Sequence, residues 1–234
     1  MTEAQKNEIR ENIARIKSDM SAYPNAELMA VIKTRTAEEI NFAIRECGVT
    51  LVGENRVQEF LAHYEEADHS AEWHFIGTLQ KNKVKYIVDK VDMIESLDSV
   101  GLAEEIDKRA GKIGKKMPVL IEINIGREES KGGIIPEALR DFCEALQKYP
   151  NLLPKGLMTI APVCADKNEY NRYFLEMNIL KDTVFKAYFP ETQAILSMGM
   201  SGSFEQALKN GSNIIRIGEG IFGKRNYPPK PSEA

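Results

Sequence analysis

The sequence has few cysteines, and their spacing offers no pair. Cys47, Cys143 and Cys164 are the three cysteines among 234 residues, and no Cys-x-x-Cys motif occurs. A disulfide framework needs an even set, and a thiolate metal site needs closely spaced pairs, so neither is expected. The thiols are therefore predicted to be reduced and mostly buried, as in a cytoplasmic protein.

Long apolar runs, a basic excess and histidine metal motifs are also missing. No stretch of about 18 apolar residues occurs, and charges interrupt the N-terminal segment MTEAQKNEIRENIARIKSDM, so neither a membrane span nor a signal peptide is predicted. Lys and Arg number 31 against 35 Asp and Glu, a net charge of -4, which argues against nucleic-acid or membrane partners. His63, His69 and His74 lack metal-ligand spacing, so no metal site is expected.

What the sequence does contain is a regular alternation of apolar runs with charged segments of helical period. The run VLIEINI at 119–125 is nearly continuous, as in a parallel strand covered on both faces. Strands are predicted at 28–33, 50–53, 73–76, 93–96, 119–125, 155–160, 194–198 and 213–217. Helices are predicted at 3–21, 37–46, 57–67, 80–89, 99–111, 136–149, 167–187 and 203–210. This α/β pattern favours a single (β/α)8 TIM-type barrel with an additional N-terminal helix over an open doubly wound sheet.

The domain organisation is predicted to be simple. No Gly/Ser/Pro linker divides the chain, and its length is slightly under the roughly 250 residues typical of the barrel. We therefore expect one barrel over residues 1–225 and a flexible proline-rich tail, NYPPKPSEA, over residues 226–234.

Lys33 closes the first predicted strand, directly after the apolar run LMAVI at 28–32. A lysine held there would be partly desolvated, which lowers its pKa and makes it a nucleophile toward carbonyl groups. Strand-terminal lysines also commonly just reach solvent, and the strand context alone favours that interpretation. The barrel changes the balance, because its reactive groups gather at the carboxyl ends of the strands.

The segment after the seventh predicted strand, SMGMSGS at 197–203, resembles a phosphate cradle. Barrels commonly bind phosphate after strands seven and eight. Glycines let the backbone approach an anion, serine hydroxyls donate hydrogen bonds, and the N-terminus of the following helix attracts negative charge. The alternative is that Ser201 or Ser203 serves only as a helix N-cap.

The segment after the eighth predicted strand, RIGEGIFG at 216–223, has the spacing Gly-x-Gly-x-x-Gly. A dinucleotide fingerprint is rejected, because it should open a βαβ unit and only eleven residues follow Gly223. We predict instead that this backbone closes on the same phosphate as Ser201, and that Arg216 directs a fixed cation toward the ligand.

Seven segments carry a family resemblance over nearly the whole chain. They are AVIKT at 30–34, GENRVQE at 53–59, EWHFIGTLQKNK at 72–83, INIGREESKGG at 123–133, GLMTIAP at 156–162, LSMGMS at 196–201 and IRIGEGIFGKRNY at 215–227. Together and in this order they resemble the pyridoxal phosphate homeostasis protein family, single-domain relatives of the N-terminal barrel of alanine racemase.

The resemblance implies pyridoxal 5'-phosphate (PLP) as cofactor and six residues that bind it: Lys33, Asn55, Ser201, Arg216, Gly218 and Glu219. It implies that Lys33 holds PLP as a Schiff base and that Asn55 lies near the ring. Ser201 would hold the phosphate together with two backbone N–H groups after the eighth strand, and Arg216 would face the pyridine nitrogen.

Two positions depart from the pattern of the family. Ile32 stands where a small residue usually precedes the lysine, and by strand alternation its side chain should point away from the side of Lys33. Ser203 stands where an aspartate is usual, which removes an acid near the phosphate but leaves the hydrogen-bond donors in place.

The predicted function is intracellular PLP homeostasis without substantial catalytic turnover. Arg216 cannot accept a proton, so it would leave the pyridine nitrogen neutral and carbanion chemistry weakly supported. The resemblance implies that a racemase takes its second base from a C-terminal domain, which this chain is not expected to have. The expected partners are PLP and PLP-dependent apoenzymes, and the expected state is a monomer.

Two alternatives remain open at this point. One is a PLP-dependent amino-acid racemase or related enzyme in which a partner supplies the second base. The other is a barrel that binds another phosphorylated aldehyde or a sugar phosphate through the same cradle.

Overall fold

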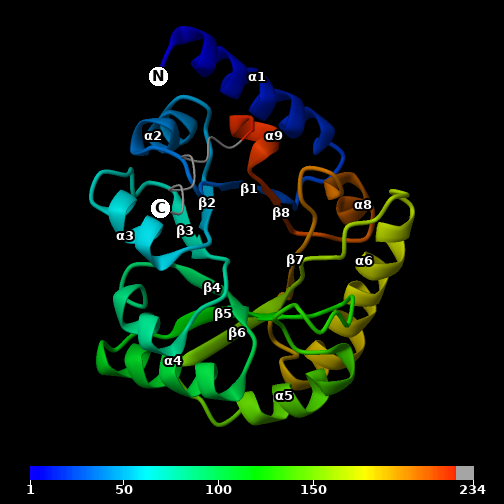
Figure 1. The fold of residues 1–234 in the computed structure, drawn as a ribbon. Helices are drawn as coiled ribbons and strands as arrows, with labels where there is room; N and C mark the ends of the chain where they lie inside the picture. The colour runs from blue at the N-terminus through cyan, green and yellow to red at the C-terminus, as the bar shows by residue number, and fades with distance from the viewer. Residues whose placement is uncertain (225–234) are drawn as a thin grey trace, which may run out of the picture.

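The computed structural model describes residues 1–224 and forms a closed barrel of eight parallel strands (Figure 1). Each strand pairs with the next along the chain, and β1 also pairs with β8. The strands are β1 Glu27–Val31, β2 Leu51–Glu54, β3 Glu72–Phe75, β4 Met93–Leu97, β5 Met117–Glu122, β6 Leu152–Met158, β7 Ile195–Ser197 and β8 Ile214–Ile217. The predicted (β/α)8 barrel is confirmed, whereas the predicted tail at 226–234 lies outside the described residues.

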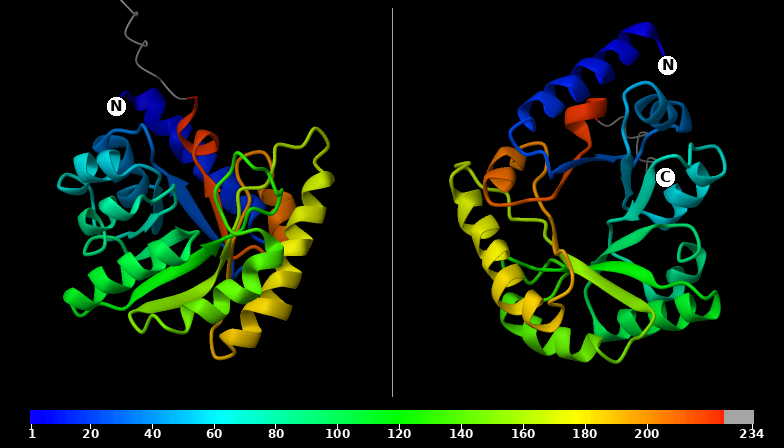
Figure 2. Two further views of the ribbon diagram at one scale, coloured as in Figure 1. Left: turned by 60° about the horizontal axis from the view of Figure 1, so that its bottom comes forward. Right: turned by 180° about the vertical axis from the view of Figure 1, so that it is seen from behind.

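Helices form an outer ring around the strands (Figures 1 and 2). The α-helices are α1 Glu3–Asp19, α2 Ala37–Arg45, α3 Val57–Tyr64, α4 Val100–Lys112, α5 Leu139–Leu146, α6 Glu169–Leu180, α7 Lys186–Tyr188, α8 Phe204–Lys209 and α9 Glu219–Phe222. The additional N-terminal helix, α1, packs beside α9. Among the residues described, no helix is both long and apolar enough to cross a membrane.

Three helical segments depart from α-helical geometry. The helix predicted at 80–89 is a 3₁₀ helix, η1, over Lys81–Tyr86. In an α-helix Lys81 and Lys85 would be a like-charged pair one turn apart, which is unfavourable. The helix predicted at 167–187 is instead α6, the π-helical turn η3 at Lys181–Phe185 and α7, and a short 3₁₀ turn, η2 at Pro136–Ala138, leads into α5.

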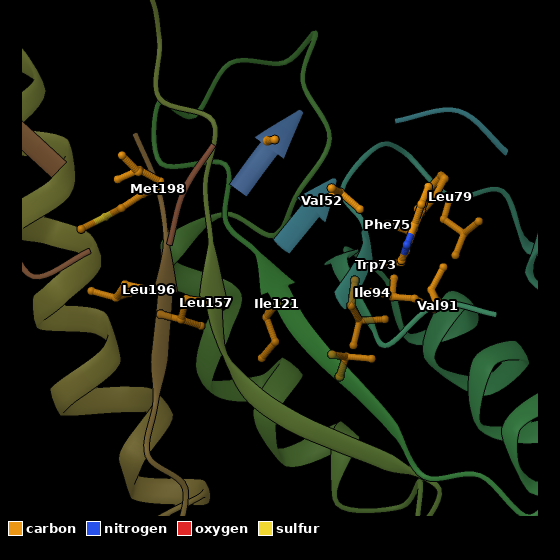
Figure 3. Close-up of a cluster of buried hydrophobic side chains, with 14 of the residues drawn as sticks. Val52, Trp73, Phe75, Leu79, Val91, Ile94, Ile121, Leu157, Leu196 and Met198 are labelled. Atoms are coloured by element: carbon orange, nitrogen blue, oxygen red, sulfur yellow. The ribbon is translucent and has the colours of Figure 1, made fainter. Parts of the chain in front are cut away.

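Strand alternation divides the buried side chains between two regions. Side chains that point outward, among them Ile32, Val52 and Trp73, belong to the large core between strands and helices, part of which is shown in Figure 3. Met29 and Val31 point inward and form a cluster inside the barrel with Leu51, Ile76 and Ile214. Met93, Leu120 and Met158 form a second inner cluster. The barrel interior is therefore a packed core and not a channel.

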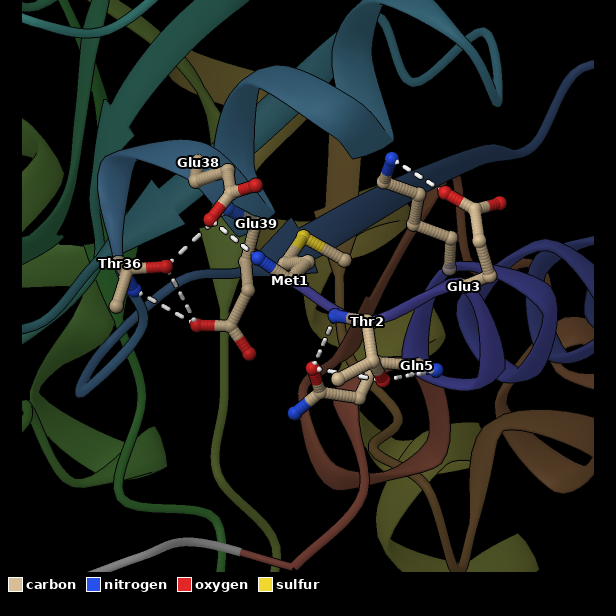
Figure 4. Close-up of polar contacts among 8 residues, drawn as sticks. Met1, Thr2, Glu3, Gln5, Thr36, Glu38 and Glu39 are labelled. Carbon is tan, nitrogen blue, oxygen red and sulfur yellow. Dashed lines mark hydrogen bonds and ion pairs between the residues drawn. The ribbon is translucent and has the colours of Figure 1, made fainter.

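Two capping boxes begin helices α1 and α2 close to each other (Figure 4). The side chain of Thr36 accepts the N–H of Glu39 at 3.2 Å, and the Glu39 carboxylate accepts the N–H of Thr36 at 2.8 Å. Thr2 and Gln5 form the same reciprocal pair at the start of α1. Such boxes satisfy helix N–H groups that have no partner within the helix. The N-cap of α2, three residues after Lys33, is thereby fixed.

Candidate functional site

A cavity of about 340 Å³ opens at the carboxyl ends of the strands and is lined by all six predicted site residues: Lys33, Asn55, Ser201, Arg216, Gly218 and Glu219. Its volume falls within the roughly 300–1,000 Å³ of small-molecule sites. Strand β8 supplies Arg216, and the segments after β1, β2, β7 and β8 supply the others, although they are far apart in the sequence. Gly202, part of the predicted phosphate cradle at 197–203, also lines the cavity, whereas sequence reasoning gave no site role to the remaining lining residues Val31, Ile76, Ile160 and Met200.

Lys33 lies two residues beyond the end of β1, not on its last residue as predicted. Val31 lines the cavity, whereas Ile32 is fully buried in the outer core, so Lys33 again faces the cavity and is half-buried. Thr34 then adopts φ 64, a left-handed conformation that is rare for a β-branched residue. Its N–H donates to the carboxylate of Glu59 at 2.8 Å, which holds the chain in this turn directly after Lys33.

Arg35 connects the Lys33 segment to the last helix. Its side chain is 8% exposed and donates to the carbonyl oxygens of Phe222 at 3.1 Å and Gly223 at 2.7 Å. The guanidinium also lies 5.3 Å from the centre of the Phe222 ring. These contacts place a cation at the carboxyl end of α9, where the helix dipole favours positive charge. The N-terminal end of the same helix carries Gly218 and Glu219.

The two segments predicted to form a phosphate cradle meet at Ser201. The hydroxyl oxygen of Ser201 accepts the N–H of Gly220 at 3.2 Å. A Cβ atom at Gly220 would lie only 2.8 Å from Cγ2 of Ile217 and 3.2 Å from Oγ of Ser201, so glycine permits the close approach. The first N–H groups of a helix have no partner within the helix, and those of α9 adjoin this contact.

Ser203 occupies the N-cap position of α8 but does not cap it with its side chain. Its hydroxyl instead accepts the N–H of Met200 at 3.2 Å and is buried away from the cavity lining. Ser203 therefore stabilises the loop, and Ser201 is the serine that faces the cavity. Gly199, with φ 93, provides the turn between β7 and this loop.

Arg216 points from β8 into the barrel and forms part of the cavity wall while only 4% exposed. Its Nη1 donates to the hydroxyl of Ser197 at 2.8 Å and its Nη2 to the carbonyl of Thr159 at 2.7 Å. Burial lowers the pKa of Arg216, against the opposing charges of Glu95 and Glu122, but a guanidinium remains protonated in proteins. The site therefore has a fixed cation at its inner end.

Below Arg216, sequence reasoning missed a buried hydrogen-bonded chain. The Ser197 hydroxyl donates to Glu95 at 2.6 Å, and Nδ1 of His74 lies 2.7 Å from the other oxygen of Glu95. His74 is 2% exposed and does not line the cavity, so it belongs to the barrel interior. Its Nε2 has no hydrogen-bond partner within residues 1–224 and lies 3.5 Å from the carboxylate of Glu72. An acid in the centre of the apolar strand MIESL was the available signal for Glu95.

Asn55 is positioned by the acid that precedes it. Glu54 is fully buried, and one of its oxygens accepts the N–H of Asn55 at 2.6 Å and of Arg56 at 3.0 Å. Burial raises the pKa of Glu54 to about 7, although both backbone bonds favour the ionised form. The side-chain oxygen of Asn55 is buried and has no hydrogen-bond partner within residues 1–224. Such a group in a cavity wall is suited to a polar ligand.

Comparison with known proteins places this geometry in a family. The model of the alanine racemase N-terminal domain matches residues 5–226. The pyridoxal phosphate homeostasis protein of Aquifex aeolicus is 46% identical over 203 residues, which cover 86% of this chain and 88% of that protein. The protein of the same name from Escherichia coli K12 is 35% identical over 96% of this chain and its own full length.

Solved structures agree with these matches. PipY of Synechococcus elongatus with PLP bound has a TM-score of 0.81 and 32% identity, covering 92% of this chain and all of PipY. Alanine racemase of Clostridium difficile has a TM-score of 0.75 at 17% identity, and the match covers 96% of this chain but 58% of the racemase, so it shows the barrel fold alone. The chain belongs to the pyridoxal phosphate homeostasis protein family, whose barrel is that of the alanine racemase N-terminal domain.

Proposed function

We propose that this protein binds PLP as a Schiff base on Lys33 and maintains the intracellular PLP supply without substantial catalytic turnover. The observation that carries the proposal is that one cavity contains all six residues expected to bind PLP. The relatives named for PLP homeostasis and the PLP-bound structure of PipY support the same ligand.

The groups around the cavity fit the functional groups of PLP. The cofactor offers an aldehyde that an amine can capture reversibly, together with a pyridine nitrogen, a ring hydroxyl and a phosphate. Lys33 supplies the amine and Arg216 an N–H donor for the ring nitrogen. Ser201, with the backbone at Gly218 and Glu219, supplies donors for the phosphate. The unpartnered amide oxygen of Asn55 supplies a polar contact beside the ring.

Arg216 also supports a role in binding rather than in catalysis. A carboxylate beside the pyridine nitrogen would keep it protonated, whereas a guanidinium can only donate and leaves it neutral. A neutral ring withdraws electrons weakly and so stabilises a carbanion poorly. Lys33 is then suited to hold and release an aldehyde, and we propose that PLP-dependent apoenzymes receive it from a cytoplasmic monomer.

Reduction with borohydride tests the covalent step. The protein is incubated with PLP, reduced and digested, and the peptides are analysed by mass spectrometry. A pyridoxyl adduct is expected on Lys33 and should be absent from the Lys33→Ala variant. Lys85→Ala, which removes an exposed lysine of η1 outside the cavity, should retain the adduct and the visible absorption band. Wild-type protein without an adduct at excess PLP would refute the proposal.

Hydrogen exchange separates storage from racemisation. Amino acids are incubated with the PLP-loaded protein in deuterated water, and loss of the α-proton is followed by NMR. We expect no exchange above the rate with free PLP. Exchange at enzyme-like rates that depends on Lys33 would support the racemase alternative instead. Transfer is tested by reactivating a PLP-dependent apoenzyme, and the monomer by light scattering.

A further inference from the structure

Four polar side chains form a layer inside the barrel where apolar side chains would be usual. His74 of β3, Glu95 of β4, Ser197 of β7 and Arg216 of β8 are all 4% exposed or less. Apolar clusters adjoin this layer inside the barrel. Barrel interiors are normally filled by Val, Ile and Leu, and burying charged groups is costly compared with apolar packing. Stability alone therefore does not account for this layer.

Charges alternate along the layer. Burial works against ionised His74, but the carboxylates of Glu72 and Glu95 raise its pKa to about 9, so the ring is an imidazolium at neutral pH. Burial likewise opposes ionisation of Glu95, yet His74, Arg216 and Ser197 hold the pKa of the carboxyl below its usual value. The layer thus reads imidazolium, carboxylate, hydroxyl, guanidinium.

The hydroxyl of Ser197 sets the order of donors and acceptors in this hydrogen-bonded layer. It accepts from Nη1 of Arg216 at 2.8 Å and donates to Glu95 at 2.6 Å, and His74 occupies the second carboxylate oxygen at 2.7 Å. With the Thr159 carbonyl on Nη2, two acceptors hold one side of the planar guanidinium. A guanidinium has five N–H donors in a rigid plane, so fixing two of them also fixes the direction of the others.

We propose that Glu95 is a positioning residue for the cofactor, which acts through the Ser197 hydroxyl to hold the Arg216 guanidinium in the orientation that binds the pyridine nitrogen. Arg216 belongs to the cavity wall, whereas Glu95, Ser197 and His74 do not, and the hydrogen bonds that connect these three to the cavity run through Arg216. This inference rests on the proposed function and adds to it the group that aligns Arg216.

A pair of ligands isolates the contact with the ring nitrogen. One is PLP, and the other is its benzene analogue, in which C–H replaces the ring nitrogen while the aldehyde, hydroxyl and phosphate remain. Binding of both is measured for the wild type and for Glu95→Gln, which keeps the size of the side chain but removes its charge. Loss of one aligned hydrogen bond corresponds to about a tenfold increase in Kd. Glu95→Gln should therefore raise the Kd for PLP by about tenfold and the Kd for the analogue by less than about twofold.

Two results would overturn the inference. One is an equal loss for both ligands, which is what general damage to the barrel would produce. The other is a change in PLP affinity below about twofold, less than about 0.4 kcal/mol. Wild-type protein that binds PLP while Glu95→Gln binds it equally well refutes this inference alone, whereas wild-type protein without a Lys33 adduct refutes the proposed function.

A second variant covers the case in which Glu95→Gln does not fold. Ser197→Ala changes no charge but removes the link between Glu95 and Arg216, so it should show the same selective loss of PLP over the analogue. Ser197→Thr retains a hydroxyl and should restore PLP binding. If Ser197→Ala weakens neither ligand or both equally, the inference fails.

Discussion

Replacing Arg35 with alanine removes the contact between the Lys33 segment and the carboxyl end of α9. The guanidinium donates to the Phe222 and Gly223 carbonyls at 3.1 and 2.7 Å and lies 5.3 Å from the Phe222 ring. Hydrogen bonds to charged groups contribute about 1.5–3 kcal/mol each, and the lower value applies here because one bond is only partly buried. With about 0.5–1 kcal/mol for the ring contact, Arg35→Ala should lower the free energy of unfolding by roughly 3–4 kcal/mol.

Urea denaturation of the protein without PLP measures this loss directly, with the free energy extrapolated linearly to water. Arg45→Ala is the matched control, because Arg45 is 59% exposed and pairs with Asp68 at the surface, where ion pairs contribute about 0–1 kcal/mol. Arg35→Lys should fall between wild type and Arg35→Ala, since an ammonium keeps the charge but loses the planar fork and the stacking.

Arg35→Ala should also weaken cofactor binding, because Arg35 connects two parts of the cavity. Lys33 lies two residues before Arg35, and α9 begins at the residues expected to hold the phosphate. We therefore expect Arg35→Ala to raise the Kd for PLP by about tenfold or more, which corresponds to about 1.4 kcal/mol or more of binding free energy. A stability loss below about 1 kcal/mol, no larger than that of Arg45→Ala, would refute the reasoning that Arg35 fixes α9.

Three further changes test the cavity loop and the barrel interior. Gly199→Ala should lower the free energy of unfolding by about 2–3 kcal/mol, because φ is 93 and the new Cβ would lie 2.5 Å from Cβ of Ala207. It should also weaken the binding of inorganic phosphate, measured by thermal shift. Glu122→Gln should stabilise the protein by about 1–2 kcal/mol at pH 8 but not at pH 4. Burial and the charge of Asp98 raise the pKa of Glu122 to about 7, although Arg216 lowers it, so ionisation of Glu122 destabilises the folded state as the pH rises from the ordinary carboxyl pKa to about 7. His74→Gln should abolish a stability loss that the wild type shows as pH rises. The pKa of His74 in the folded state, about 9, lies above the ordinary histidine value of 6.5. Its contribution to the free energy of unfolding is therefore complete below pH 6.5 and is lost as the pH rises through 9. Parallel curves of unfolding free energy against pH for wild type and variant between about pH 6 and 10 would contradict the buried ion pair.

Much of the barrel could be predicted because its strands are local patterns. The apolar runs at 119–125 and 28–32 mark buried strands without any knowledge of their partners. The helix predicted at 80–89 was wrong in type, since its period fitted a helix but its like-charged lysines disfavour an α-helix. Lys33 was placed on the strand and lies two residues beyond it, because strand ends depend on pairing with neighbours.

Some residues of the candidate site could likewise be predicted from local sequence motifs, and others could not. Lys33, Ser201 and Arg216 could be named because each follows or ends a predicted strand in a motif with recognisable chemistry. Asn55 came from the resemblance alone. The apolar lining from Ile76 and Ile160 carried no signal, because such residues are common in every strand of the chain.

By itself the sequence determined the period of the elements, the order of the strands along the chain and the residues that could react with an aldehyde or contact a phosphate. Only the tertiary structure decided which side chains hold those residues in place. Arg35 meets Phe222 across 187 residues, and Ser197 meets Glu95 across 102. Closure of the barrel brings such pairs together, and the pairing of β1 with β8 that completes it is a long-range contact with no local trace in the sequence.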